Sequence, residues 1–365
     1  MPVSKVPTTS ALQDPMDVIA SLPPAFSRRQ AVDIVRDHYG LTAKATALVS
    51  ERDQNFHLLM DDGREFVLKI ANALEDPLVT DFQIQALLHI DARNDALVRT
   101  PTVLKTRRNE HSVVVEAGEN SHVIRVVSYL PGKPIGSKVP NRMLAGKMGT
   151  YLARMGAALS DFSHPGADHR LLWDMKEAAC LRALLQHIPD VETRDLATRT
   201  LDDFESRCLP IFATLRWQVI HNDMNLDNIL LAGTGPADIA GVIDFGDMLR
   251  SPLIVDVAVA ASYLRVLDGD PLLLIAEFLA GYHREVPLLR PEVDILHDLI
   301  KVRLMTTVTI LSWRESTRGA DDAYLQAAAN VESTAAAFLG RMCEVPRANA
   351  TQVYRQVCAS VSELA

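Results

Sequence analysis

Four side chains in this sequence have the types, and come in the order, that phosphoryl transfer requires. Asp223 and Asn228 lie five residues apart in one loop-like segment, Asp244 opens Asp-Phe-Gly, and Lys69 stands in Val-Leu-Lys-Ile. A carboxylate can accept the proton of an attacking hydroxyl, an amide and a second carboxylate can hold Mg²⁺, and a lysine can grip phosphates. We therefore expect Asp223 to be the catalytic base, Asn228 and Asp244 to bind Mg²⁺, and Lys69 to bind the nucleotide.

The elements around these residues change in kind along the chain. Ser27 to Gln30 has the form of a capping box before a short helix, and residues 44–71 are rich in β-branched and aromatic residues. Asp61-Asp62-Gly63 predicts a hairpin turn that would place Lys69 on a strand. A helix is expected at 78–90 and strands at 102–105, 112–116 and 122–130, which together make a small antiparallel sheet of about five strands with one inserted helix.

The rest of the chain reads as strongly helical, at 141–162, 174–188, 191–214 and from 252 to the end. The interval 219–250 is non-helical and carries Asp223, Asn228 and Asp244. The sequence thus predicts an α+β fold: residues 1–25 as a flexible extension, 26–130 as a nucleotide-binding N-lobe, and 131–365 as a helical C-lobe with the catalytic loop and substrate site. A cleft between lobes is where a small ligand usually binds.

The motifs resemble those of the aminoglycoside phosphotransferase and choline kinase superfamily. The resemblance lies in the loop from His221 to Asn228 and in Asp-Phe-Gly-Asp at 244–247. Within the superfamily, hydroxylysine kinase and its bacterial relatives are most similar, on Asp-Gln-Asn-Phe-His at 53–57, Phe-Val-Leu-Lys-Ile-Ala-Asn at 66–72 and the segment 125–135. The similarity to hydroxylysine kinase extends to Leu-Trp-Asp-Met-Lys at 172–176 and to residues 241–248. The resemblance implies a protein-kinase-like two-lobe fold, Mg²⁺ as cofactor, and ATP or GTP as donor.

Other nucleotide-site residues are less clearly marked. Backbone amides of residues 50–55, a loop without glycine, are expected to touch phosphates with help from Asn55, although a bare hairpin is an equal alternative. Asp81 is the nearest acidic partner for Lys69 on the following helix, unless an amide replaces it. Tyr129 and Leu130, where the last strand enters the second lobe, should line the base pocket or simply pack in the core.

Two residues are assigned to the support of the catalytic loop. His221 is expected to shape that loop by packing and hydrogen bonding. Asp256 begins a buried-looking helix and would be costly if unpaired, so it should accept hydrogen bonds from the loop.

An acceptor with an ammonium and a carboxylate group would need an acid and an arginine in its pocket. The candidates in the helical lobe are Asp174, Arg250, Arg303 and Arg314, although charged residues more often mark solvated helix faces. Asp247, beside the expected metal ligand, could bind the ammonium or a second metal, and a solvated acid is an equal alternative.

Composition narrows the function classes. The chain has 365 residues, 48% apolar and 23% charged, with 37 basic and 46 acidic residues and a net charge of −9. No dense basic run or long apolar stretch occurs, which argues against nucleic-acid and membrane partners. Four scattered cysteines favour reduced thiols in a cytoplasmic protein. The oligomeric state stays open.

We therefore expect a kinase that phosphorylates a hydroxyl of a small amine or amino acid, most like hydroxylysine. Aminoglycosides, choline, ethanolamine and homoserine are alternative acceptors, and a nucleotide-binding module without activity is an alternative of another class. A protein kinase is disfavoured because Arg250-Ser251-Pro252 leads almost directly from Asp244 into a helix, without an activation segment.

Overall fold

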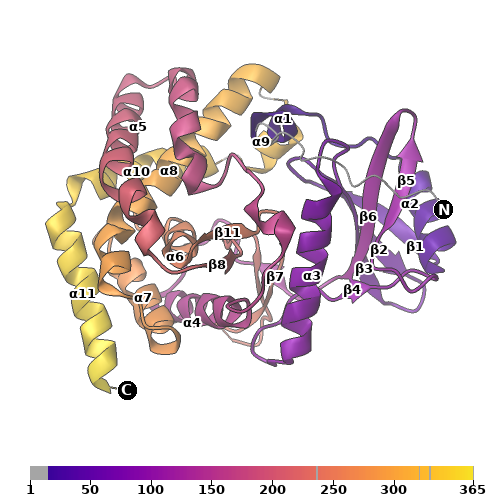
Figure 1. Ribbon diagram of the computed structural model, residues 1–365, viewed down its shortest axis with the longest axis horizontal. Coiled ribbons are helices and arrows are strands. Elements are labelled where there is room, and N and C mark those ends of the chain that lie inside the picture. The colour runs from indigo at the N-terminus through magenta and orange to yellow at the C-terminus, as the bar shows by residue number, and fades with distance from the viewer. Residues whose placement is uncertain (1–14, 236, 320, 329, 365) are drawn as a thin grey trace, which may run out of the picture.

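An antiparallel sheet forms the N-terminal lobe of the computed structural model, which describes residues 15–235, 237–319, 321–328 and 330–364 (Figure 1). Its strand order is β1 (Ala43–Leu48), β2 (Gln54–Met60), β3 (Glu65–Ile70), β6 (Asn120–Ser128) and β4 (Val103–Leu104), with β5 (Val113–Ala117) also paired to β6. The hairpin between β2 and β3 turns at residues 61–63, where Gly63 has a φ of 83°. The expected sheet and turn are confirmed.

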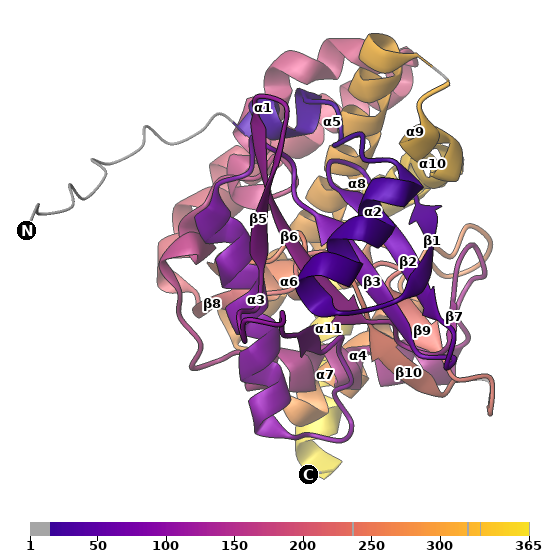
Figure 2. The same ribbon diagram turned by 90° about the vertical axis from the view of Figure 1, so that its right-hand side faces the viewer.

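The two faces of the sheet have different partners, because successive side chains on a strand point to opposite faces. Phe56 and Leu68 face a small core closed by α2 (Arg28–Ile34), whose capping box of Ser27 and Gln30 is formed. Asn55, Lys69 and Arg125 share one register row on the opposite face. α3 (Pro77–Arg93) covers that face, and Figure 2 shows α2 in front of the sheet.

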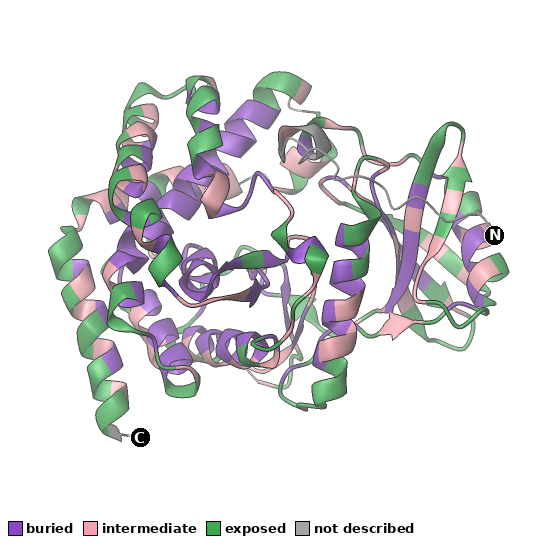
Figure 3. Ribbon diagram, in the orientation of Figure 1, coloured by how far each residue is buried: buried purple, intermediate pink, exposed green. Residues whose placement is uncertain are grey.

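The helical lobe is built around one long helix, α8 (Arg290–Arg318), whose buried residues run from Glu292 to Arg314. The lobe's interior is buried, whereas α11 exposes its outer face (Figure 3). The other helices are α4 (Arg142–Ala158), α5 (Val191–Asp203), α6 (Leu253–Ala261), α7 (Leu273–Glu285), α9 (Ala323–Ala327), α10 (Val331–Glu344) and α11 (Arg347–Leu364). The expected helix at 174–188 is a 3-10 helix, Met175–His187.

Short strands in the helical lobe hold the non-helical interval. They are β7 (Lys133–Pro134), β8 (Trp217–Ile220), β9 (Ile229–Leu231), β10 (Ile239–Val242) and β11 (Leu249–Pro252), paired as β10-β9-β7 and β11-β8. Asp223 and Asn228 lie between β8 and β9, and Asp244 follows β10. The α+β fold with two lobes is confirmed. None of the helices in the described ranges combines the length and apolar character that a bilayer span needs.

The start of the chain corrects one expectation. α1 (Pro15–Ala20) precedes the N-lobe, and Ile19 is 2% exposed within the large core. Arg318 donates to the carbonyl groups of Ile19 (2.8 Å) and Ser21 (2.6 Å). The expected flexible extension of residues 1–25 is therefore wrong around residues 15–22, and residues 1–14 lie outside the described part.

Candidate active site

A buried carboxylate from α6 fixes the loop between β8 and β9. Asp256 accepts hydrogen bonds from the backbone N–H groups of His221 (3.1 Å) and Asn222 (2.8 Å). The loop holds Asn222 at a φ of 62°, a left-handed conformation that asparagine adopts more readily than most residues. The expectation that Asp256 ties its helix to the loop is confirmed, and burial raises the pKa of this carboxyl to about 6.

His221 supports the same loop from inside. Its side chain is fully buried, its Nδ1 accepts a hydrogen bond from the Asp223 N–H (3.2 Å), and its ring meets Phe245 edge-on at 4.7 Å. Burial lowers the pKa of His221 to about 4, so the ring is neutral near pH 7. The geometry suits a positioning residue rather than a proton carrier.

Asp223 lies at the end of this support, with its carboxylate held by amides. Asn225 Nδ2 donates to both carboxylate oxygens (3.1 Å each), and Asn228 Nδ2 donates to Oδ2 (2.8 Å). Arg303 Nη2 lies 3.4 Å from Oδ1. Desolvation and the neighbouring Asp247 carboxylate raise the pKa of Asp223 well above its ordinary value, against the opposing effect of Arg303.

Asp244 and Lys69 meet across the two lobes. Lys69 Nζ lies 3.0 Å from Asp244 Oδ1, and the Gly246 N–H donates to the same oxygen (3.3 Å). Asp244 has a φ of 60°, a conformation that is rare for a residue with a side chain and turns the carboxylate toward the sheet. The Lys69 ammonium holds the pKa of Asp244 well below its usual range.

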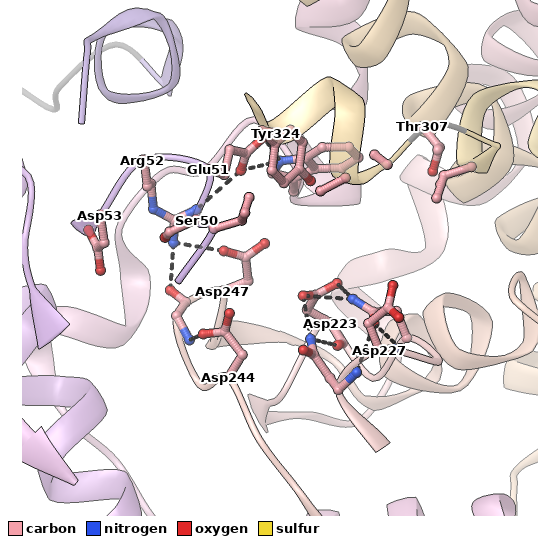
Figure 4. A pocket seen from close by; sticks show the side chains of 18 of the residues that line it. Ser50, Glu51, Arg52, Asp53, Asp223, Asp227, Asp244, Asp247, Thr307 and Tyr324 are labelled. Carbon is pink, nitrogen blue, oxygen red and sulfur yellow. Dashed lines mark hydrogen bonds and ion pairs between the residues drawn. The ribbon is translucent and has the colours of Figure 1, made fainter. Parts of the chain in front are cut away.

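Lys69, Asp223, Asn228 and Asp244 line one cavity of about 410 Å³ between the lobes (Figure 4). One wall of the cavity is the segment 49–53, which connects β1 to β2. Helix α8 contributes Arg303, Thr307 and Leu311, at four-residue spacing, to the lining. The structure thus brings together the four residues that the sequence singled out.

The donor set suits a hard divalent cation that is shared with phosphate. Asn228 uses its Nδ2 to bind Asp223, which leaves Oδ1 as the amide atom available to an ion, and Asp244 offers carboxylate oxygens. In the described part of the chain, no three His, Cys, Asp or Glu side chains converge on one point. An ion bound here would therefore need further oxygen ligands from phosphate and water.

Two expected nucleotide-site residues, Asp81 and Asn55, are not among the residues that line the cavity. Asp81 faces His164 (Nε2–Oδ2, 3.1 Å) and Gln85 (3.2 Å), so Asp244 rather than Asp81 is the acidic partner of Lys69. Asn55 is beside Lys69 in register but is 8% exposed and does not line the cavity. The expected help of Asn55 in binding phosphate therefore stays a prediction.

Tyr129 and Leu130 lie in the connection between the lobes, as expected. The Tyr129 ring packs on His57 with centroids 4.6 Å apart, and its N–H donates to the Glu65 carbonyl (3.2 Å). Leu130 packs so closely on β10 that a Cβ at Gly241 would lie 2.8 Å from its side chain. Their contact with a nucleotide base stays a prediction.

Three of the five expected substrate residues do not line the cavity. Asp174 is buried, caps the 3-10 helix at Met175–His187, and pairs with Lys176 (3.2 Å). Arg250 lies over the Trp217 ring at 5.2 Å. Arg314 faces Glu51 (3.6 Å) and stacks on Tyr324 (4.7 Å), behind the cavity wall. Asp247 and Arg303 do line the cavity.

The structure adds residues that the sequence analysis did not single out. They are the loop residues Glu51 and Arg52 and the aromatic residues Trp173, Tyr263 and Tyr324. Arg303 stacks on Trp173 at 4.9 Å and donates to its carbonyl (3.1 Å). A second cavity of about 770 Å³ shares the lining residues Asn225, Asp227 and Tyr263 with the first. Lys69 does not line this second cavity, so the combined space extends away from Lys69. Arg52 lies in the segment 50–55, for which the sequence predicted phosphate contacts of the backbone amides and not of the Arg52 side chain.

A two-lobe α+β fold, with a sheet lysine facing an acidic loop and an Asp-Phe-Gly carboxylate across one cavity, defines a phosphotransferase of the kinase type. The chain belongs to the phosphotransferase enzyme family (APH), whose sequence profile matches residues 44–295. Hydroxylysine kinase from Mus musculus is 26% identical over 318 residues, 80% of this chain and 84% of the relative. The Bos taurus hydroxylysine kinase is 27% identical over 314 residues, with coverages of 80% and 83%.

Solved structures agree on the fold. An amicoumacin kinase in complex with AMP-PNP, Ca²⁺ and Ami superposes with a TM-score of 0.66 at 14% identity, covering 87% of this chain and 94% of the other. A microcompartment-associated aminopropanol kinase gives 0.60 at 19% identity, with coverages of 86% and 96%. The expected kinase-like fold is confirmed, and the chain is a small-molecule kinase.

Proposed function

We propose that this kinase transfers the γ-phosphoryl group of ATP or GTP, with Mg²⁺, to a hydroxyl of a small amino acid or amine, with hydroxylysine as the first candidate. The observation that carries the proposal is that Lys69, Asp223, Asn228 and Asp244 line one cavity. The mouse and bovine relatives, both hydroxylysine kinases, support the choice of acceptor.

Asp223 is the proposed base. The acceptor oxygen attacks the γ-phosphorus in line while the bond from that phosphorus to the bridging β,γ-oxygen breaks, and the hydroxyl proton passes to the Asp223 carboxylate. Asn225 and Asn228 orient this carboxylate through their amide groups. The direct transfer needs no covalent enzyme intermediate.

The donor side uses groups from both lobes. Lys69 would bind the phosphates, and Tyr129 and Leu130 would contact the base where the lobes connect. Asn228 Oδ1 and Asp244 would hold Mg²⁺, which supplies a positive charge that neutralises the phosphate oxygens. Whether ATP or GTP is preferred is decided by experiment.

The acceptor side combines opposite charges with aromatic walls. Arg303 is a guanidinium within reach of an acceptor carboxylate, and Asp247 is an acid that can bind an ammonium. Trp173, Tyr263 and Tyr324 close the apolar part of this side. A hydroxylated amino acid satisfies all three features.

A panel assay tests the proposal. The purified chain is incubated with Mg²⁺, ATP or GTP, and one acceptor from a set that includes hydroxylysine, homoserine, ethanolamine, choline, 1-amino-2-propanol and kanamycin, and release of ADP or GDP is measured. We expect the highest kcat/KM with hydroxylysine. A preference for acceptors without a carboxylate would contradict the acceptor assignment, and nucleotide binding without turnover on any hydroxyl compound would contradict the catalytic one.

A further inference from the structure

The connection between β1 and β2 forms a wall of the cavity that is made of side chains. Residues 49–53 all line it, and the connection contains no glycine. Glycine-rich phosphate loops bind through backbone N–H groups, because no Cβ separates the backbone from the ligand. Here a side chain of the loop is the group that can reach a phosphate most directly.

Arg52 is the cation of this loop. Its guanidinium Nη2 lies 2.7 Å from Asp247 Oδ1 and 2.8 Å from the Gly246 carbonyl, so it reaches the segment that follows the proposed metal ligand Asp244 (Figure 4). Asn72 anchors the backbone of the loop, with its Nδ2 on the Arg52 carbonyl (3.0 Å) and its N–H on Asp53 (3.2 Å). The main chain is held by the sheet lobe while the guanidinium crosses the cleft.

Glu51, which lies 3.8 Å from Arg52, also fastens the loop to the helical lobe. Glu51 accepts hydrogen bonds from Trp173 Nε1 (3.0 and 3.2 Å) and lies 3.6 Å from Arg314. The ion pair from Arg52 to Asp247 is therefore not the only link between this loop and the opposite lobe. The Arg52 guanidinium can exchange Asp247 for another anion while Glu51 keeps the loop closed.

The charges around the cavity give that exchange a driving force. Among the described residues, three cations line the cavity, and each has at least one carboxylate neighbour. Lys69 lies beside Asp244 (3.0 Å) and Arg303 beside Asp223 (3.4 Å). Arg52 is closest to Asp247 (2.7 Å) and lies farther from Glu75 (3.7 Å) and Glu51 (3.8 Å). A triphosphate bound with its metal would add anionic oxygens beside these cations. Guanidinium binds phosphate through two parallel N–H···O bonds, a geometry that lysine does not offer.

We propose that Arg52 is a phosphate-binding residue, whose guanidinium leaves Asp247 and binds the γ-phosphate of the donor nucleotide. The proposal rests on the proposed function, because it takes the cavity as the triphosphate site. Arg52 would then hold the transferred group from the side opposite Asp223 and would stabilise its charge during transfer. The released Asp247 carboxylate would become available to the acceptor ammonium.

Binding of three nucleotides of increasing phosphate length tests this inference. Dissociation constants of AMP, ADP and AMP-PNP with Mg²⁺ are measured by calorimetry for the full chain and for Arg52→Met and Arg52→Lys. We expect Arg52→Met to weaken AMP-PNP at least tenfold and ADP about threefold or less, with AMP unchanged. Arg52→Lys keeps the charge without the paired donors, so it should fall between the wild type and Arg52→Met.

Trp173→Phe is the matched control, because it removes the Nε1–H donor to Glu51 and loosens the same loop without removing a cation. It should change the three dissociation constants by one common factor. The inference would be overturned if the Arg52 variants bound AMP-PNP and AMP with the same ratio of dissociation constants as the wild type. If Arg52→Met does not fold, the result for Arg52→Lys decides. A wild-type chain that binds none of the nucleotides would overturn the proposed function itself.

Discussion

At the scale of single residues, the cavity pairs each of its cations with a carboxylate that has a proposed part in the reaction. In the part of the chain that the structure describes, Lys69 contacts Asp244 (3.0 Å), whereas no lysine contacts Asp223, whose cationic neighbour is Arg303 (3.4 Å). Desolvation and Asp247 raise the pKa of Asp223, whereas Lys69 lowers the pKa of Asp244. The carboxylate with the raised pKa has the greater proton affinity, as a base requires, and the one with the lowered pKa stays ionised to hold a cation.

Replacing Asp223 by asparagine tests this division. Asp223→Asn keeps the size and one acceptor oxygen for the neighbouring amide groups but removes the charge and the second acceptor, so we expect kcat to fall about 10³-fold while the nucleotide Kd changes by less than about threefold. Steady-state kinetics and calorimetry measure the two quantities. Asp227→Asn, in the same loop and cavity, is the control and should lower kcat less than about tenfold. An Asp223→Asn enzyme with more than about a tenth of wild-type kcat would argue against the base assignment.

At the scale of elements, α4 and α7 pack backbone against backbone. A Cβ on Gly281 would lie 1.9 Å from the Gly146 carbonyl oxygen, and a Cβ on Gly149 would lie 1.9 Å from that of Phe278. No side chain fits such a gap, so the two helices depend on glycine at their crossing. The C-terminal part of α4 also contacts β8, where Gln218 Nε2 donates a hydrogen bond to the Gly156 carbonyl (2.9 Å).

Gly281→Ala should separate α4 from α7 and lower the free energy of unfolding by about 2–3 kcal/mol, the usual cost of overpacking. Gly340→Ala in α10 is the matched control, because no atom of the described residues outside its own stretch of helix lies within 4 Å of its Cβ position. In a helix this substitution should raise the free energy of unfolding by about 0.5–1 kcal/mol. Urea denaturation of both variants measures the difference, and equal midpoints would show that the close contact is absent.

The packing of α8 on α10 contains a titratable group. His297 is 1% exposed and its Nε2 bonds to the Met342 carbonyl (3.1 Å), so this nitrogen carries the proton of a neutral ring. Burial and Lys301 lower the pKa of His297 to about 4. The folded state then binds fewer protons than the unfolded state between that value and about 6.5.

Stability should accordingly fall as the pH drops through this window. The contribution of His297 is fully present above about pH 6.5, and about 3 kcal/mol of it is lost by pH 4. His297→Gln keeps a donor for Met342 but does not titrate, and groups that titrate in both chains cancel in the difference. Urea denaturation at pH 4 to 7 should give a wild-type curve with the steeper pH dependence, and parallel curves would refute the assignment.

Local chemistry explains which elements were predictable from the sequence. Two predicted elements depend on neighbouring residues and are present: the hairpin turn at residues 61–63 and the capping box at Ser27. The lysine, the loop and the Asp-Phe-Gly segment also follow one another in the order that the sequence shows. Side-chain direction is set by packing between distant segments instead. Asp81, Asp174 and Arg250 lie near the motifs in sequence, yet packing turns them toward other partners.

Contacts across the two lobes were least predictable. Arg52 and Asp247 lie in different lobes, and nothing in the residues around either one signals the other. The helix at Pro15–Ala20 has too few residues for an apolar period, so its docking through Ile19 was missed. The acceptor residues Trp173, Tyr263 and Tyr324 likewise come together only in the folded chain.

At the scale of the whole molecule, the two lobes are joined by packing and polar contacts as well as by the chain segment 129–132. Buried residues of α3, such as Phe82 and Ile90, belong to the large core of the helical lobe, although the helix covers the sheet. The ion pair between Lys69 and Asp244 and the contacts of Glu51 add polar links across the cleft. A nucleotide that binds both sides should therefore stabilise the molecule as a unit.

Thermal unfolding with and without ligand measures this coupling. At 100 times its Kd, AMP-PNP with Mg²⁺ should add about 2.7 kcal/mol to the free energy of unfolding, and excess EDTA should remove most of that gain because the metal ligands would lose their ion. Asp244→Asn should abolish the metal-dependent part, whereas Asp238→Asn, on the β9–β10 hairpin and paired with Lys147, should retain it. An equal gain in Asp244→Asn would mean that the nucleotide and its metal bind without this carboxylate, and the cavity would lose its assignment as the site where the two lobes meet the triphosphate.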